Sequence, residues 1–316
     1  MNENIIIRKL QPCDCDDYNI QLVQYYFESV TMSAYEENYS KLDAEKKISE
    51  LKMYLEMNQA IVFGAFDDSK LIGFVWAYKF PFREDVNRLY ISVVHVDSLY
   101  RNQGIGKQFI QSIELEAKKL GIETIFLHAE ATNDRACKFY EREGFSKERI
   151  QYVRHPQTES TKNKVGGVIE ATPEFVLKNK AELSNLYYDN VKAHYFTFQY
   201  SINDAEKKIE QLHNYMEKDR ARLYYIWESQ IVAMMWVHPI DIYHQQRIYM
   251  HAIEVNKSVR GKGYGSALYY NLENDYPDTI IYTHVDYSNI ISRKLHEKVG
   301  FVPEKYQFEK NIAEFS

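Results

Sequence analysis

Two short glycine-containing segments have residue types and spacing that suit binding of a phosphate group. Arg101 is followed by Gly104 and Gly106, and Arg260 is followed at the same spacing by Gly263 and Gly265. Each segment lies between a predicted strand and a predicted helix, so its glycines allow close approach of an anion to the helix N-terminus. Both segments lack the third glycine of a Rossmann fingerprint and the Gly-Lys-Ser/Thr of a P-loop. The pattern favours pyrophosphate binding without nucleotide hydrolysis.

The two segments belong to an internal repeat. Residues 39–48 recur as residues 200–209, with eight of ten positions identical. The segment that contains Arg101 recurs 159 positions later, and residues 133–145 recur 156 positions later. This period is far longer than the roughly 20 to 50 residues of a solenoid unit. Each copy is therefore expected to be a domain.

Each copy is predicted to be an α/β domain. In the first copy, apolar residues at helical spacing predict helices over residues 41–57, 104–120 and 134–143. Apolar runs predict strands over residues 60–66, 71–79, 89–96 and 124–129, with a last strand near 149–154. The predicted fold class is α/β, with two tandem domains, each a mixed, mostly antiparallel sheet flanked by helices.

A polar stretch separates the copies. Residues 156–165 have no hydrophobic periodicity, and Gly166 and Gly167 follow them. We predict a linker there, with one domain over residues 1–155 and the other over residues 166–316.

Composition limits the class of function. The chain has 39 Lys and Arg against 45 Asp and Glu, a net charge of −6, and neither half is basic, which argues against nucleic-acid binding. The apolar run at residues 5–7 is too short for a signal peptide, and residues 231–237 are too few to span a membrane. Cys13, Cys15 and Cys137 support neither a disulfide framework nor a four-ligand zinc site. We expect a cytoplasmic, metal-free protein without membrane contacts.

Taken together, the motifs resemble the GNAT superfamily of N-acetyltransferases. The resemblance rests on residues 94–96, 101–106, 133–140 and 144–145 and on their counterparts in the second copy, and covers roughly residues 5–154 and 168–312. It implies that each Arg-x-x-Gly-x-Gly turn holds the pyrophosphate of acetyl-CoA. It also implies that the preceding strand pairs with the pantetheine arm, and that CoA is the product.

The resemblance implies cofactor contacts in both copies. In the first copy they are Val94, Val96, Arg101, Asn102, Gln103, Gly104, Ile105, Gly106, Lys107 and Asn133. In the second copy they are Ile253, Val255, Arg260, Gly261, Lys262, Gly263, Tyr264, Gly265, Ser266 and Asn289. The four strand residues would be core residues under any function, so only backbone contacts are meant for them. The two asparagines are equally consistent with helix N-caps.

Acetyl transfer to an amine needs both a base and an acid. An alkyl ammonium with a pKa of about 10.4 is only about one part in 2,500 neutral at pH 7, a handicap of roughly 4.6 kcal/mol. The departing thiolate needs a proton donor. Tyr140 matches the thiolate-protonating tyrosine of the family, the alternative being a core aromatic residue. His296 stands at the equivalent position and can also donate a proton, which leaves open which copy is catalytic.

The resemblance implies that the base can lie on the strand before the glycine turn, where some acetyltransferases of the superfamily have a histidine or glutamate. Alternation of side chains places Tyr90 and Ser92 on one face in the first copy, and Tyr249 and His251 on the equivalent face in the second. His251 is the predicted base of the second copy, the alternative being a structural histidine.

The first copy has no such histidine on that face. It would need Glu84 or Asp85 from the preceding loop, or a chain of water molecules. Alternation places His95 and Glu254 on the opposite face, unless a β-bulge intervenes.

The leading hypothesis is an acetyl-CoA-dependent N-acetyltransferase that transfers acetyl to a primary amine of a small molecule or peptide by direct attack. The net negative charge is compatible with a cationic acceptor. One alternative is a CoA-binding sensor or scaffold in which one or both copies are inactive, as the change from Tyr140 to His296 suggests. Another is an aminoacyl-tRNA-dependent transferase, disfavoured by the retained turns and the absence of a basic half. The acceptor and the oligomeric state stay open.

Overall fold

The computed structural model describes residues 5–31, 39–80, 87–156, 167–194, 200–242 and 244–313. The chain forms two compact units. Unit 1 comprises residues 1–148 and 305–316, and unit 2 comprises residues 149–304. Most of the predicted linker, residues 157–165, lies outside the described residues, so the domain boundaries predicted from the sequence stay a prediction.

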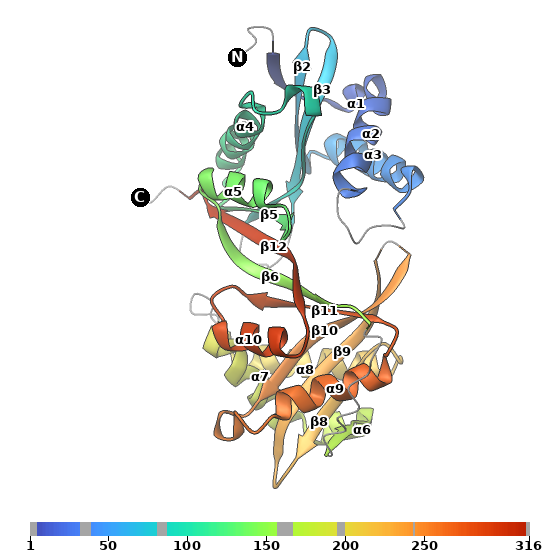
Figure 1. The fold of residues 1–316 in the computed structure, drawn as a ribbon, viewed down its shortest axis with the longest axis vertical. Coiled ribbons are helices and arrows are strands. Elements are labelled where there is room, and N and C mark those ends of the chain that lie inside the picture. The colour runs from blue at the N-terminus through green and yellow to red at the C-terminus, as the bar shows by residue number, and fades with distance from the viewer. Residues whose placement is uncertain are drawn as a thin grey trace. The chain divides into compact units, whose positions relative to one another are not determined.

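Unit 1 contains a mixed sheet with helices on both faces (Figure 1). Its strand order is β1-β2-β3-β4-β5-β12, and all neighbouring pairs are antiparallel except the parallel pair of β4 and β5. The strands are β1 (Ile5–Lys9), β2 (Ala60–Asp67), β3 (Lys70–Lys79), β4 (Arg88–Val96), β5 (Thr124–Glu130) and β12 (Val302–Asn311). The prediction of a mixed, mostly antiparallel sheet is confirmed.

The helices of unit 1 fall into two groups. Helices α1 (Pro12–Asp17), α2 (Asn19–Thr31) and α3 (Lys41–Glu56) cover one face of the sheet, and α4 (Ile105–Lys119) and α5 (Asp134–Arg142) cover the other (Figure 1). Helix α4 packs on the core through Phe109, Ile110 and Ile113, all buried and at helical spacing.

Unit 2 repeats this arrangement, with strand order β6-β11-β10-β9-β8-β7. Its strands are β6 (Ser146–Arg154), β7 (Val168–Glu170), β8 (Arg222–Trp227), β9 (Ile231–Ile242), β10 (Gln245–Val255) and β11 (Ile280–Asp286). Its helices are α6 (Pro173–Lys178), α7 (Lys180–His194), α8 (Ile202–Met216), α9 (Tyr264–Asp275) and α10 (Ile290–Lys298).

The duplicated segment at residues 39–48 forms the start of a helix in both units. Ser40 accepts a hydrogen bond from the backbone N–H of Asp43 at 3.2 Å, and Ser201 accepts one from Asp204 at 3.3 Å. The aspartates return hydrogen bonds to the serine N–H groups, which completes a capping box. Ala44 and Ile48, with their counterparts, are buried within their own units. The repeat here therefore preserves a helix start and its packing.

The last strand of each copy belongs to the sheet of the other copy. Strand β6 ends the first copy in sequence, yet residues 149–154 pair with β11 in unit 2. Strand β12 ends the second copy, yet residues 305–311 pair with β5 in unit 1. Hydrophobic alternation predicts a strand but carries no information on which of two similar sheets receives it.

Candidate functional site

The first glycine turn, residues 101–106, connects β4 to α4 and is held in place by local hydrogen bonds. The Arg101 Nε donates to the backbone carbonyl of Val96 at 3.0 Å, and Asp97 caps the short 3₁₀ turn before it by accepting from the Leu99 N–H at 3.0 Å. Asn102 and Gly104 have positive φ values of 67° and 84°. Since the first N–H groups of α4 have no intrahelical acceptor, the turn presents donors at the positive end of a helix.

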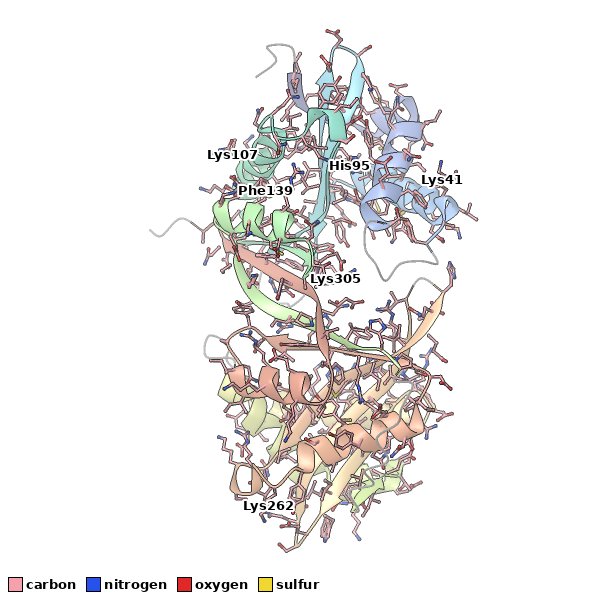
Figure 2. The ribbon with its side chains drawn as sticks, viewed as in Figure 1. Lys41, His95, Lys107, Phe139, Lys262 and Lys305 are labelled. Carbon is pink, nitrogen blue, oxygen red and sulfur yellow. The ribbon has the colours of Figure 1, made fainter. Side chains whose placement is uncertain are left out.

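The two glycines of this turn have different roles. A Cβ on Gly104 would meet nothing within 4 Å, so this glycine supplies a positive φ and leaves open space beside the amides. A Cβ on Gly106 would lie 3.3 Å from the Phe139 ring of α5. Gly106 therefore allows α4 and α5 to pack closely, whereas Gly104 provides the cradle into which an anion fits. Figure 2 shows Lys107 and Phe139 together on this side of the sheet.

The second glycine turn, residues 260–265, reproduces this geometry in unit 2. Arg260 Nε donates to the Val255 carbonyl at 3.2 Å, and Gly261 and Gly263 have φ values of 86° and 88°. A Cβ on Gly263 would again meet nothing within 4 Å, while one on Gly265 would lie 2.9 Å from Leu295. Both turns therefore have open space beside the backbone amides, which suits a pyrophosphate group.

The strand that leads into each turn diverges from its parallel neighbour. The pairing of β4 with β5 runs from Arg88 to Ile91, and that of β10 with β11 runs from Arg247 to Tyr249. Val94 and Val96 lie beyond the paired region, and their half-buried side chains pack on the core of unit 1. One edge of β4 therefore faces the fork between the strands, where an extended chain such as a pantetheine arm could hydrogen-bond to the backbone.

Asn133 and Asn289 are helix N-caps. Asn133 accepts a hydrogen bond from the Ala136 N–H at 3.0 Å, and Asn289 accepts one from the Ser292 N–H at 3.0 Å. These bonds begin α5 and α10. The cofactor role predicted for both asparagines stays a prediction.

Tyr140 lies on α5 against the core of unit 1. Its ring packs against Phe139, Phe145 and Phe308, with centroids 5.2, 5.9 and 5.8 Å away. Burial raises the pKa of the Tyr140 hydroxyl, which therefore holds its proton at neutral pH. No hydrogen bond joins this hydroxyl to a residue in the described ranges. It is thus a protonated donor without a fixed protein acceptor.

His296, at the equivalent position on α10, has a different environment. Its Nε2 lies 2.6 Å from the Tyr269 hydroxyl, and its Nδ1 lies 2.7 Å from the Ser292 carbonyl. The carbonyl only accepts, so Nδ1 carries the proton and Nε2 accepts from Tyr269. Burial lowers the pKa of His296 to about 4. Both ring nitrogens are engaged in the core, so neither is aimed at a ligand.

A β-bulge changes the face on which the strand residues lie. On β4 the register with β3 skips Ser92, and on β10 the register with β9 skips His251. The bulge brings His95 to the same face as Tyr90, because Phe74 and Tyr78, their partners on β3, share a face. Simple alternation, which placed them on opposite faces, is corrected by this extra residue.

His95 and His251 are both neutral at physiological pH. His95 is buried, its Nδ1 lies 2.9 Å from Ser29 Oγ, and burial lowers its pKa to about 4. His251 is half-buried and its ring lies 3.9 Å from the Trp236 ring, centroid to centroid. Burial lowers the pKa of His251 to about 3. The protonation state of His251 suits a base, but so low a pKa makes it a weak one.

A histidine on the neighbouring parallel strand was missed by the sequence analysis. His128 of β5 lies just beyond the last paired residue, Leu127, and its Nδ1 is 3.4 Å from the Tyr90 hydroxyl. In unit 2, the rings of His284 and Tyr249 lie 5.7 Å apart at the equivalent place. The recurrence of this histidine 156 positions later was the available signal. Both pairs lie where the strands diverge.

The two loop acids predicted as alternative bases of the first copy lie outside the described residues. Glu84 and Asp85 fall in residues 81–86, which the structure does not describe.

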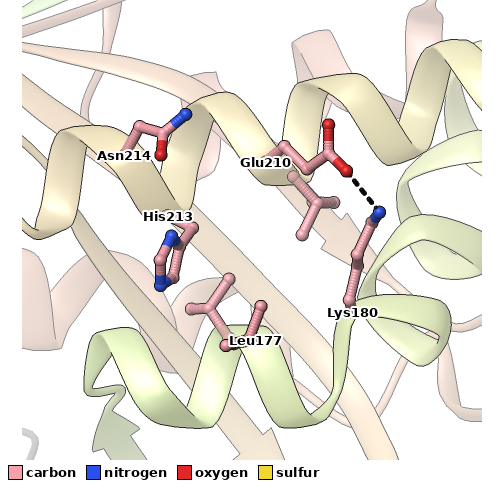
Figure 3. Close-up of a pocket in the computed structure, with 7 residues that line it drawn as sticks. Leu177, Lys180, Glu210, His213 and Asn214 are labelled. Atoms are coloured by element: carbon pink, nitrogen blue, oxygen red, sulfur yellow. Dashed lines mark hydrogen bonds and ion pairs between the residues drawn. The ribbon is translucent and has the colours of Figure 1, made fainter.

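Within the described ranges, no cluster of three or more His, Cys, Asp or Glu side chains could hold a metal ion, and no helix is long and apolar enough to cross a membrane. A pocket of about 190 Å³ between α6 and α8 contains the ion pair of Lys180 with Glu210, at 2.6 Å, but no predicted site residue (Figure 3).

Comparison with known proteins decides the family. The model of the acetyltransferase (GNAT) family matches residues 25–145 and again residues 186–301. The chain belongs to this family. The resemblance stated from the motifs and the tandem arrangement are thereby confirmed, and use of an acyl-CoA follows from membership.

Curated relatives of this GNAT chain match only part of it. Mycothiol acetyltransferase of Propionibacterium freudenreichii is 34% identical over 76 residues, covering 24% of this chain and 24% of the relative. The ribosomal protein bS18-alanine N-acetyltransferase of Escherichia coli is 29% identical over 72 residues, covering 23% of this chain and 49% of the relative. The chain therefore spans half or less of the length of these two relatives.

Solved structures share the tandem fold over nearly the whole chain. A GCN5-related N-acetyltransferase from Sphaerobacter thermophilus aligns with a TM-score of 0.59 at 16% identity, covering 99% of this chain and 97% of the other. A tandem GNAT protein from the clavulanic acid biosynthesis pathway aligns with a TM-score of 0.54 at 11% identity, covering 99% and 100%. At these identities the likeness concerns the fold alone.

Proposed function

We propose that this tandem GNAT protein is an acetyl-CoA-dependent N-acetyltransferase that transfers acetyl to a primary amine of a small molecule or peptide by direct attack. The observation that carries the proposal is that unit 1 combines an open glycine turn, a Tyr90–His128 pair where β4 and β5 diverge, and a protonated Tyr140 on α5, the helix that packs against that turn. The bound acetyl-CoA supplies an activated acetyl thioester.

The residues that would hold the cofactor are those of the two glycine turns. The N–H groups that follow Gly104 and Gly263 bind the pyrophosphate, and Arg101 and Arg260 add positive charge beside it. The free edge of β4 binds the pantetheine arm through its backbone. This placement keeps Val94 and Val96 as core residues and assigns only their main chain to the cofactor.

Two groups of unit 1 move protons. The His128 imidazole takes a proton from the attacking amine, directly or through the Tyr90 hydroxyl that lies 3.4 Å from it. Tyr140 gives its proton to the departing thiolate on the α5 side of the fork. In unit 2, His284 is the counterpart of His128 and His251 is only a weak base, and the equivalent of Tyr140 is the engaged His296. Unit 1 is therefore the better equipped catalyst.

The acceptor is proposed from charge and chemistry. The chain carries a net charge of −6, which favours approach of a cationic amine. One curated relative is named a mycothiol acetyltransferase, and the other is named for N-acetylation of an alanine of a ribosomal protein. We propose that the acceptor of this protein is a primary amine of one of these two classes, a small molecule or a peptide.

A second candidate function rests on unit 2. Because His296 has both ring nitrogens bonded in the core, unit 2 could bind CoA and have no turnover. Unit 2 would then serve as a CoA-binding sensor or scaffold beside a catalytic unit 1.

The test combines calorimetry with an acceptor screen on the full chain. CoA is expected to bind at two sites, and Gly104→Val or Gly263→Val removes one site each because valine is strained at these positive φ values. Saturation at 100 times the dissociation constant adds about 2.7 kcal/mol of stability per site. Acetylation of polyamines, aminoglycosides or peptide amines that persists in Gly263→Val and vanishes in Gly104→Val supports unit 1 as the catalyst. Absence of CoA binding in the unaltered chain would refute the proposed function.

A further inference from the structure

We propose that Glu228 weakens CoA binding at the second glycine turn, so that the two units bind CoA with unequal affinity. The inference rests on the proposed function, because it concerns the same pyrophosphate contacts. One carboxylate outside the repeated motif would thus control the CoA affinity of unit 2.

The Glu228 carboxylate contacts the side chains of two residues of the second glycine turn. The Tyr264 hydroxyl donates to Glu228 Oε1, and Lys262 Nζ lies 3.8 Å from the same oxygen. Glu228 stands in the tight connection from β8 to β9, closed by its own N–H bonding the Gln230 carbonyl at 3.1 Å. These two contacts hold a negative charge at the outer ends of the Lys262 and Tyr264 side chains, the two residues that flank Gly263. Figure 2 places Lys262 at this end of unit 2.

Unit 1 has no equivalent arrangement among its described residues. The positions of Lys262 and Tyr264 are taken by Gln103 and Ile105, and Ile105 is buried in the core. In the corresponding connection of unit 1, from β2 to β3, Asp68 is exposed and makes no contact with the first glycine turn within the described ranges. Asp67 accepts a hydrogen bond from Tyr100, which precedes that turn, at 2.7 Å.

The charge near each turn therefore differs. Residues 101–107 carry Arg101 and Lys107, and residues 260–266 carry Arg260 and Lys262, so each turn has two positive charges. Glu228 offsets one of them in unit 2. A phosphate at the second glycine turn must compete with Glu228 for Lys262 and lies close to its negative charge. Two unit charges about 4 Å apart in water change affinity by about fivefold, and salt reduces this effect.

The experiment is a calorimetric titration of the full chain with CoA in a Gly104→Val background, where only the second turn binds. Glu228→Gln, which keeps the shape of the side chain, is expected to bind CoA about three- to tenfold more tightly, and the gain should shrink in 0.5 M salt. Glu228→Ala should act in the same direction. Asp68→Asn in a Gly263→Val background is the matched control and should leave the affinity of the first turn unchanged.

Two results would overturn the inference, and they are distinguishable from failure of the proposed function. Affinity that is equal or weaker in both Glu228 variants, with CoA still bound by the Gly104→Val chain, refutes the role of Glu228 alone. If Asp68→Asn raises CoA affinity at the first turn by the same factor, the effect comes from net charge alone, and the specific role of Glu228 is refuted. An unaltered chain that binds no CoA refutes the proposed function itself. Thermal melting of each variant verifies that its fold is retained.

Discussion

The Lys310 ammonium lies 2.6 Å from the Glu114 carboxylate of α4. Its counterpart in the repeat is the ion pair of Arg154 with Glu273 of α9, also at 2.6 Å. In both pairs the cation comes from the last strand of one copy and the acid from the helix that follows the glycine turn of the other. The exchange of strands is therefore reciprocal, and each unit depends on both halves of the sequence.

A fragment of residues 1–158 is expected not to fold as a cooperative unit. It lacks β12, so β5 loses its antiparallel partner strand and the core loses Phe308, which is fully buried and packs against Tyr140. The measurement is a thermal melt followed by circular dichroism. A matched chain in which residues 302–313 replace residues 146–158 should melt cooperatively. A sharp melt of the unaltered fragment at the temperature of the full chain would show that β12 is dispensable.

Arg154→Met is expected to destabilise unit 2 by about 3–5 kcal/mol, because it leaves the Glu273 carboxylate buried without its partner. Lys310→Met is the matched variant in unit 1. Its pair is more exposed, with side chains 24% and 20% accessible, so the expected cost is about 1 kcal/mol. Urea denaturation measures both. Adding Glu273→Gln to Arg154→Met should recover part of the loss, and equal costs for the two single variants would contradict this account.

Tyr140→Phe is expected to lower turnover by about 10²- to 10⁴-fold, because the departing thiolate loses its proton donor. CoA affinity should change little, since the ring and its packing against Phe139 and Phe145 remain. Steady-state kinetics and calorimetry separate the two effects. Full activity in Tyr140→Phe, together with an inactive His296→Gln, would move the chemistry to unit 2.

His128→Gln is expected to lower turnover and to remove an ionisation from the pH profile of kcat/KM. Glutamine can still hydrogen-bond to Tyr90 but cannot take the proton of the amine. Comparison of pH–rate profiles is the measurement. His95→Gln should keep the profile, because His95 lies under α2, bonded to Ser29 and stacked on Tyr25. A profile that shifts only in His95→Gln would assign the base to that residue.

His296 is expected to make unit 2 less stable as the pH falls from about 6.5 to about 4. Its pKa is lowered to about 4 by burial, so in this window the unfolded chain binds a proton that the folded chain does not. Stability therefore falls on acidification, by roughly 3 kcal/mol across the window. In His296→Gln, which keeps an acceptor for Tyr269, the urea midpoint should depend less on pH. An unchanged dependence would indicate that His296 is not neutral in the folded state.

The sequence by itself determined the fold class, the duplication, the two glycine turns and the position of Tyr140. The duplication is found by comparing the two halves of the sequence, and the other features depend on short-range signals. Glycines at 104 and 263 are required by positive φ values, and the capping boxes at Ser40 and Ser201 join residues three apart. Such signals act within a few residues, so they can be recognised in a single amino-acid sequence.

Tertiary structure decided what depends on neighbours far away in sequence. The bulges at Ser92 and His251 follow from pairing with the adjacent strand, and they alone set the face on which His95 lies. Tyr90 and His128 meet only because β4 and β5 are parallel neighbours that diverge there. Which sheet receives β6 or β12 depends on the partner strand available, because alternating side chains fit either copy of a duplicated sheet. The engagement of His296 depends on Tyr269, which its own helix does not contain.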